Sequence, residues 1–191
     1  MKSIRGTKTE KNLLASFAGE SQARNRYAYF ASIARKEGYI QIANLFEETA
    51  ENEKEHAKRM FKFLEGGMLE ITASYPAGKI GSTPENLEAA ADGEKEEHSI
   101  LYPDFAKDAQ EEGFPEVSAM YRAVSVAEIQ HEKRYRDLLE NIRKGKVFTK
   151  DAPVRWRCNN CGYIHEGKDA PKICPACSHE QKYFELLAEN W

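Results

Sequence analysis

Two short segments, Glu53-Lys54-Glu55-His56 and Glu128-Ile129-Gln130-His131, decide the fold class of this chain. In each segment a carboxylate and an imidazole stand three residues apart, so both project from one face of a helix. Each segment lies inside a long heptad-like apolar pattern, at positions where leucine would suit a helix core. Paired Glu-x-x-His motifs of this kind predict a di-metal site between the helices of a bundle.

Four helical patterns contain or flank these motifs, over residues 9–36, 40–64, 83–112 and 115–144. Thr7 and Glu10 form a potential capping box for the first, and Thr83-Pro84 is predicted to start the third. Turns at Gly38 and Gly113 predict two antiparallel helical hairpins, and the aperiodic segment 65–82 predicts a long crossover between them. The expected fold is mainly α, with a ferritin-like four-helix bundle at residues 1–146.

The two predicted hairpins are related by an internal repeat. A shift of 75 residues superposes them, matching Gly38 with Gly113, Glu53 with Glu128, and His56 with His131. At a shift of 74, Glu20 falls on Glu94, so the second copy gains one residue between Glu94 and Gly113. At the same shift Glu97 falls on Ala23, which gives the second copy one additional carboxylate.

Carboxylate and imidazole side chains on the core faces of these helices are the candidate metal ligands: Glu20, Glu53, His56, Glu94, Glu97, Glu128 and His131. Bare carboxylates in one core would be strongly destabilising, because each isolated buried charge costs several kcal/mol. Two metal ions would nearly balance these charges. Mixed oxygen and nitrogen ligation suits iron or manganese, with zinc as an alternative occupant. The simpler alternative is that Arg24 and Arg26 form buried ion pairs with the carboxylates.

Residues beside the predicted ligands have more than one interpretation. Tyr27 and Tyr102 are predicted to hydrogen-bond ligand carboxylates or to relay a radical, with plain aromatic packing as the alternative. Gly19 and Gly93 each precede a predicted ligand in mid-helix, where glycine costs roughly 1 kcal/mol against alanine. They are interpreted as allowing close backbone approach or access of a small molecule, or as simply tolerated. His98 is interpreted as a surface or supporting residue and not as a ligand.

The last part of the chain, residues 147–191, has no helical periodicity and contains all four cysteines. Cys158-x-x-Cys161 and Cys174-x-x-Cys177 have the spacing of a tetrahedral four-cysteine metal site, which a module this small needs in order to fold. Such paired cysteines indicate metal ligation in a reducing compartment instead of disulfides. The spacing alone permits zinc or a single iron, and neither nearby histidine is expected to be a ligand.

Composition narrows the class of partners. The net charge is -3, so nothing attracts the chain to nucleic acid or to an anionic membrane. No apolar run approaches the length of a membrane span. The N-terminal residues lack the apolar region of a signal peptide. We therefore expect a cytoplasmic protein without nucleic-acid or membrane partners.

The cysteine segments Cys158-Asn159-Asn160-Cys161-Gly162-Tyr163 and Cys174-Pro175-Ala176-Cys177 resemble those of rubredoxin, although Ser178 replaces the usual glycine and the insert between them is shorter. The complete chain resembles the rubrerythrin family, with all of the motifs in order: Glu20, Glu53-x-x-His56, Glu94-x-x-Glu97, Glu128-x-x-His131 and the four cysteines.

This resemblance implies a non-haem iron peroxide reductase that protects against oxidative stress. The implied cofactors are two irons in a carboxylate-bridged site and one iron in the four-cysteine site. Electrons from rubredoxin or an NAD(P)H-dependent reductase would enter at the cysteine-bound iron, and the di-iron site would reduce hydrogen peroxide to water. The implied catalytic residues are Glu97 and His56, which exchange as ligands of one iron. Tyr27 and Tyr102 are added to the predicted catalytic residues because of their positions beside the ligands. The family also implies a head-to-tail homodimer or a larger homo-oligomer.

Two other functions compete with this one. The same ligands would serve a ferroxidase or another iron-handling protein. A non-enzymatic helical dimer with a structural zinc ribbon, binding nucleic acid or another protein, is the second alternative. The acidic balance and the core carboxylates oppose it.

Overall fold

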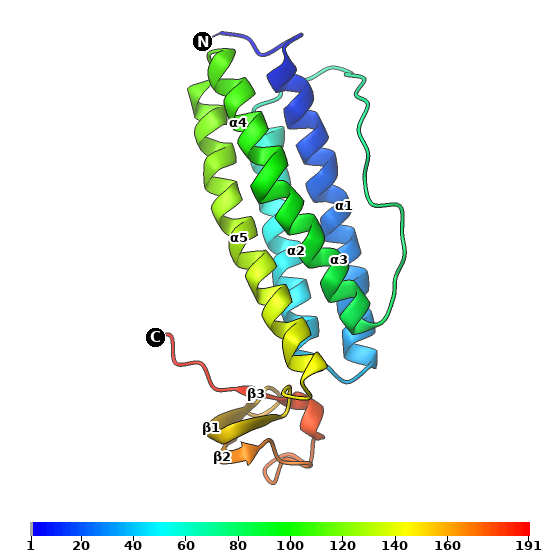
Figure 1. Ribbon diagram of the computed structural model, residues 1–191, viewed down its shortest axis with the longest axis vertical. Coiled ribbons are helices and arrows are strands. Elements are labelled where there is room, and N and C mark those ends of the chain that lie inside the picture. The colour runs from blue at the N-terminus through cyan, green and yellow to red at the C-terminus, as the bar shows by residue number, and fades with distance from the viewer. Residues whose placement is uncertain (1) are drawn as a thin grey trace.

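The computed structural model describes residues 2–191 and is mainly helical, as predicted. Its bundle is built from these helices: α1 (Lys8–Lys36), α2 (Ile40–Phe61), α3 (Thr83–Glu96), α4 (Tyr102–Glu111) and α5 (Pro115–Arg143). Figure 1 shows α1 and α2 as one antiparallel hairpin packed against a second hairpin made of α3, α4 and α5. The crossover between the hairpins runs along the outside of the bundle without regular secondary structure.

The helix ends differ from the prediction in small ways. The N-cap of α3 is Ser82, one residue earlier than predicted, because the hydroxyl and backbone N–H of Ser82 complete a capping box with Glu85. Helix α2 ends at Phe61 instead of residue 64, because Phe63 N–H and Leu64 N–H donate three residues back and tighten the last turn. At α1, the Thr7 hydroxyl accepts from Glu10 N–H, as predicted for the N-cap. The predicted capping box is not completed, because the Glu10 carboxylate accepts from Gly6 N–H instead.

The third predicted helix is interrupted by a π-helical segment, η1 (Glu97–Leu101), between α3 and α4. The prediction of one regular α-helix was therefore wrong at this point. A π-helical turn accommodates one extra residue within a helix, which accounts for the change of repeat shift from 74 to 75. Because the extra residue is absorbed in η1, Glu94 before it and Tyr102 after it are both buried, like their counterparts Glu20 and Tyr27.

The bundle core has two apolar halves separated by a polar layer. One half is aromatic and lies toward the α1–α2 turn, where each of four rings contacts at least two of the others: Tyr27, Phe30, Phe46 and Tyr135. The other half, toward the N-terminus, is built around Leu13, Met60, Tyr102 and Tyr121. Between the two halves lie buried glutamate and histidine side chains, so the apolar packing holds this polar layer in mid-bundle.

The C-terminal domain is a three-stranded antiparallel sheet at one end of the bundle (Figure 1). Its strands are β1 (Thr149–Cys158), β2 (Ile164–Asp169) and β3 (Phe184–Leu186), in the order β2-β1-β3, and a 3₁₀ turn, η2 (Gln181–Tyr183), precedes β3. Trp156 is fully buried in its core, and its indole N–H donates to the Gly167 carbonyl over 3.0 Å. The predicted boundary at residues 146–147 lies between the end of α5 and the start of β1.

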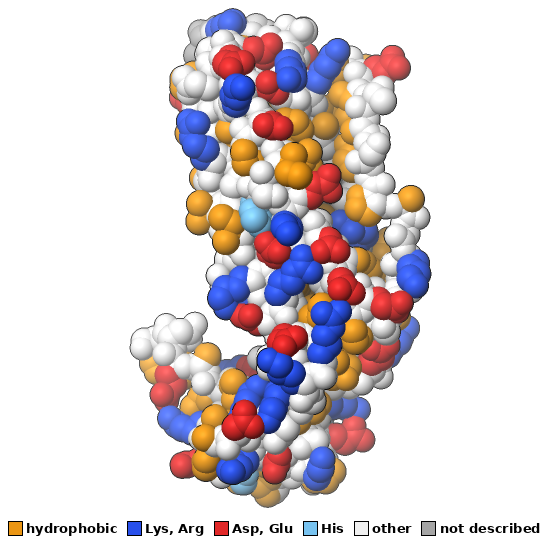
Figure 2. All heavy atoms as spheres, viewed as in Figure 1, with side chains coloured by type: hydrophobic (Ala, Val, Ile, Leu, Met, Phe, Trp, Pro, Cys, Tyr) orange, Lys and Arg blue, Asp and Glu red, His pale blue; other side chains and the backbone are white. Residues whose placement is uncertain are grey.

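Charged side chains of both signs are interspersed over the face shown in Figure 2, so this face has no continuous basic surface. Within residues 2–191, the helices are too polar for any of them to cross a membrane.

Candidate metal centres

Four helices contribute to the polar layer in the bundle core. Glu20 comes from α1, Glu53 and His56 from α2, Glu94 from α3, and Glu128 and His131 from α5. The side chains form two groups of potential ligand atoms, each within 4.8 Å of one another: Glu20, Glu53, His56 and Glu128 in the first, and Glu53, Glu94, Glu128 and His131 in the second. The structure thus brings together six of the seven predicted bundle ligands.

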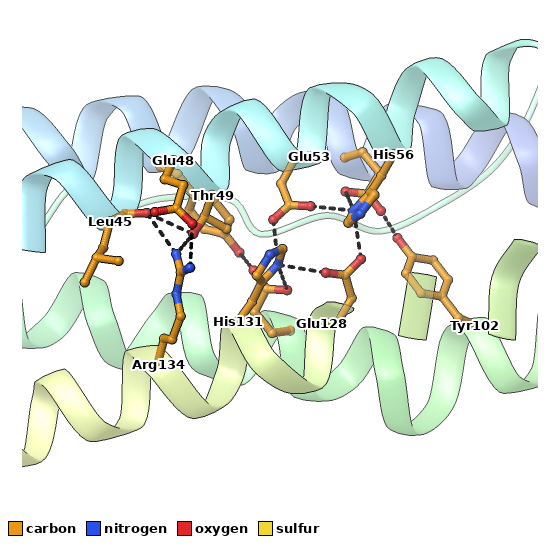
Figure 3. Close-up of polar contacts among 12 residues, drawn as sticks. Leu45, Glu48, Thr49, Glu53, His56, Tyr102, Glu128, His131 and Arg134 are labelled. Atoms are coloured by element: carbon orange, nitrogen blue, oxygen red, sulfur yellow. Dashed lines mark hydrogen bonds and ion pairs between the residues drawn. The ribbon is translucent and has the colours of Figure 1, made fainter. Parts of the chain in front are cut away.

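Glu53 and Glu128 belong to both groups and span the space between the two imidazoles (Figure 3). Glu53 places one oxygen 2.9 Å from His56 Nδ1 and the other 3.1 Å from His131 Nδ1. Glu128 does the same at 3.0 and 2.8 Å. Glu20 approaches only His56, at 4.0 Å, and Glu94 only His131, at 3.5 Å. This geometry suits Glu53 and Glu128 as bridging carboxylates and Glu20 and Glu94 as terminal ones.

The donor atoms of the cluster fit metal ions better than they fit one another. Within residues 2–191, Glu20, Glu53 and Glu94 each bury one oxygen without a hydrogen bond, Glu128 buries both, and His131 Nδ1 lacks hydrogen-bonding geometry despite its close carboxylates. Buried charges left unpaired are strongly destabilising. Oxygen-rich ligation completed by one imidazole per group is typical of iron and manganese. These residues therefore fit two metal ions.

Two tyrosines support the terminal carboxylates. The Tyr27 hydroxyl donates to Glu94 Oε1 over 2.5 Å, and the Tyr102 hydroxyl donates to Glu20 Oε1. Burial, followed by the adjacent carboxylate charge, raises the pKa of both phenols well above 10, so both remain protonated donors. Tyr121 contacts Tyr102 at 5.5 Å between ring centroids, and its hydroxyl lies within hydrogen-bond distance of the Ser16 hydroxyl.

Glu97 lies on η1, outside both groups of four, and is half-buried. The next residue, His98, places Nε2 at 2.7 Å from Glu132 of α5, which tethers η1 to that helix. Glu132 had not been identified from the sequence, because no helical period links it to η1. The arginine alternative fails for Glu20, Glu53, Glu94 and Glu128: Arg24 pairs with exposed Glu51, and within residues 2–191 no ion pair joins an arginine to these four carboxylates. At Glu97, burial and the Glu94 charge raise the carboxyl pKa well above its usual range, and the charge of Arg26 opposes this without reversing it.

In the metal-free cluster, bound protons offset part of the negative charge of the carboxylates. Burial lowers the pKa of each histidine, but contacts with Glu128 and Glu53 outweigh it and raise the pKa to about 10 for His56 and about 12 for His131. Burial opposes the change at Glu53, yet the two imidazoles lower its pKa to about 2. Burial and the Glu53 charge raise the pKa of Glu94 to about 8.

The metal-free bundle should therefore lose stability as the pH rises from about 5 to about 9. Glu94 and both histidines bind protons more tightly in the folded chain than in the unfolded one, so deprotonation favours unfolding. Metal binding must displace these protons, so metal affinity should rise over the same range. Thermal unfolding followed by helical circular dichroism, with and without chelator at three pH values, checks this. A melting temperature of the metal-free protein that rises with pH contradicts it.

The four cysteines of the C-terminal domain also converge. Their sulfurs lie within 4.8 Å of one another, with Cys158 to Cys177 at 3.8 Å and Cys161 to Cys174 at 3.7 Å. Thiolates about 2.3 Å from a central ion at the corners of a tetrahedron are about 3.8 Å apart, so the site fits a tetrahedral metal. The His179 backbone N–H lowers the pKa of Cys177 to about 6, which favours its thiolate form.

Ser178 occupies the position equivalent to Gly162 in the other cysteine segment. Gly162 N–H donates to the Cys158 carbonyl and Ser178 N–H to the Cys174 carbonyl, at 2.8 and 2.9 Å. Both residues are left-handed, with φ of 79° and 59°. Ser178, which replaces the glycine of the rubredoxin pattern, thus keeps the same backbone hydrogen bond at the cost of a strained left-handed backbone.

Ser178→Gly is expected to stabilise the C-terminal domain by roughly 0.5–1 kcal/mol, because it removes the cost of a side chain in the left-handed region. Chemical denaturation of the metal-loaded protein, followed by the fluorescence of buried Trp156 over the constant background of exposed Trp191, measures the change. Ser178→Ala is the control and should give no gain, since alanine keeps the Cβ atom. Equal effects of the two variants would contradict the strain argument.

A ferritin-like bundle with a buried carboxylate–imidazole cluster, joined to a four-cysteine domain, belongs to the class of di-iron redox proteins. The family model for rubrerythrin matches residues 11–139, and the model for the rubredoxin-like domain of rubrerythrin matches residues 156–185. This chain belongs to the rubrerythrin family, whose di-iron and rubredoxin-like domains bind iron and make it a redox enzyme.

The chain is similar to named rubrerythrins over its whole length. It is 61% identical to rubrerythrin of Porphyromonas gingivalis over 190 residues, covering 100% of this chain and 95% of that protein. It is 55% identical to rubrerythrin of Nitratidesulfovibrio vulgaris over 191 residues, covering 100% of both. A solved structure of fully reduced, all-ferrous nigerythrin matches with a TM-score of 0.63 and 34% identity, over 97% of this chain and 92% of that one.

Proposed function

We propose that this protein reduces hydrogen peroxide to water. The reaction consumes two electrons and two protons per peroxide, and two irons held by the cluster would supply one electron each. The observation that carries the proposal is the surplus of ligands: both groups of four are complete without Glu97, which leaves its carboxylate free to take part in a change of ligation.

In this proposal two irons would be held by Glu53 and Glu128, which belong to both groups, with Glu20 and His56 completing one group and Glu94 and His131 the other. Glu97 and His56 are the two side chains that would alternate in holding the iron on the Glu20 side. An anionic oxygen suits the oxidised, harder ion, and a neutral imidazole suits the reduced one. His56 belongs to the same group as Glu20, whereas Glu97 lies outside both groups, and this arrangement supports the exchange. Tyr27 and Tyr102 hold the terminal carboxylates in place throughout, because both phenols remain protonated.

Cys158, Cys161, Cys174 and Cys177 would hold a single iron that accepts electrons from rubredoxin or from an NAD(P)H-dependent reductase. Within one chain the C-terminal domain contacts the bundle near Gly38, where the Lys182 side chain lies 3.8 Å from the position of an added Cβ. Glu53 lies about 20 Å further along α2. This separation supports a homodimer in which the cysteine-bound iron of one subunit serves the di-iron site of the other. The proposed compartment is a reducing cytoplasm, where the thiolates are maintained.

The test is anaerobic reoxidation of the fully reduced, iron-loaded protein. One equivalent of hydrogen peroxide per di-iron site is added, and the di-iron and ferric-thiolate absorptions are followed separately. We expect peroxide to reoxidise the di-iron site faster than dioxygen does, with the cysteine-bound iron following. Faster reoxidation by dioxygen, together with consumption of added ferrous iron, would favour the ferroxidase alternative. A colourless C-terminal domain that retains zinc under these conditions would contradict electron entry through it.

A further inference from the structure

A cavity of about 990 Å³ lies beside the cluster, between α1, the crossover, and the α3–η1–α4 helix. Its outer wall includes exposed charged residues such as Lys11 and Glu96. Its buried end includes Tyr102, whose hydroxyl donates to Glu20, and half-buried Glu97. The cavity thus connects the protein surface with two residues that adjoin the cluster.

Residues 69–76 of the crossover, here called the strap, form one side of this cavity. Leu69 and Ile71 are half-buried while Glu70 and Thr72 are exposed, so the extended strap turns its apolar side inward. The strap is anchored at Tyr75, whose hydroxyl donates to the Ala15 carbonyl over 2.8 Å. The strap therefore gives the cavity an inward-facing apolar side at Leu69 and Ile71, and the Tyr75 side chain attaches the strap to α1.

Gly19 and Gly93 line the same cavity, and packing does not explain them. Both are helical, without positive φ. An added Cβ would meet Tyr75 at 3.7 Å at Gly19, and Arg26 at 3.8 Å at Gly93, both ordinary contacts. Close backbone approach, one of the two roles predicted from the sequence, is therefore wrong. Glycine in mid-helix costs roughly 1 kcal/mol against alanine. The role that is left for these two glycines is the space that they leave open in the cavity.

We propose that this cavity is the route by which hydrogen peroxide reaches the cluster, that Gly19 and Gly93 keep its buried end open, and that the Tyr75-anchored strap limits the size of the hydroperoxides that enter. The identity of the substrate rests on the proposed function, whereas the route does not. A small molecule that follows this route from solvent to the cluster would pass between the two glycines and beside Glu97. The two glycines keep the buried end open, and the strap sets its width.

The test uses the full-length, iron-loaded and reduced protein with hydrogen peroxide and with the bulkier tert-butyl hydroperoxide. Gly93→Leu fills the buried end, and we expect it to slow reoxidation by hydrogen peroxide about tenfold, equivalent to about 1.4 kcal/mol of added barrier. Tyr75→Ala removes the anchor of the strap and should raise the rate with tert-butyl hydroperoxide relative to that with hydrogen peroxide. Ala89→Leu, on the exposed part of α3, is the matched control and should change neither rate.

Azide separates the route from the reaction, because it ligates ferric iron and its binding is followed by absorbance without turnover. Gly93→Leu should slow azide binding by a factor similar to that for peroxide. If azide binding is slowed but peroxide reoxidises neither protein, the route stands and the proposed function fails. If Gly93→Leu retains two irons in the bundle and takes up azide at the wild-type rate, the cavity is not the route. Gly19→Leu, on the opposite wall, provides the same test if Gly93→Leu loses iron.

Discussion

Glu128→Ala is expected to remove both metals from the bundle. Glu128 places one oxygen 3.0 Å from His56 Nδ1 and the other 2.8 Å from His131 Nδ1, so its loss takes one ligand from each group. Loss of a residue that only supports a ligand typically lowers metal affinity 10–100-fold, so loss of a shared ligand should exceed about 100-fold at both sites. Iron per chain, measured after equilibration with a weak chelator, tests this prediction.

A matched comparison distinguishes shared ligands from terminal ones. Glu94→Ala removes a carboxylate from the His131 group alone and should leave one metal in the bundle. Asp137→Ala, on the exposed side of the same helix as Glu128, should retain both. The cysteine-bound iron is the internal standard in every variant, because it binds in a separate domain. Retention of two bundle irons by Glu128→Ala would show that Glu128 does not bridge.

Glu97→Ala is expected to retain both metals and to slow peroxide-driven reoxidation about a hundredfold, within the range for a side chain that acts only in the reactive step. Each group of four ligands is complete without Glu97, so binding should be nearly unchanged. Stopped-flow reoxidation of the reduced protein measures the rate, and iron analysis measures the content.

Neighbouring variants make the result specific to the Glu97 carboxylate. Lys95→Ala, two residues earlier on the exposed face of α3, should react like the wild type. Glu97→Gln keeps the size of the side chain but loses its charge, so it should be as slow as Glu97→Ala if an anionic ligand is required. Loss of metal from Glu97→Ala would instead make Glu97 an ordinary structural ligand, and an unchanged rate would remove it from the reaction.

Much of the bundle could be predicted because its signals are local. The 3.6-residue period, the turns at Gly38 and Gly113, and the Glu-x-x-His spacing each depend on a few neighbouring residues. The C-terminal site was predictable for the same reason, since two Cys-x-x-Cys units specify a four-cysteine site without knowledge of the strands around them. The repeat even indicated where a residue had been gained after Glu94.

The sequence by itself determined the helical bundle, its polar layer and the cysteine site, because a helix face is defined by spacing along the chain. Only the tertiary structure decided which carboxylates are shared between the two groups, that Glu97 stands outside both, and that a cavity reaches it beneath the strap. These features depend on where four helices and a crossover meet in space. The one-residue gain is absorbed as a π-helical turn because Glu94 and Tyr102 must both face the core, which is a constraint of packing across helices and not of local sequence.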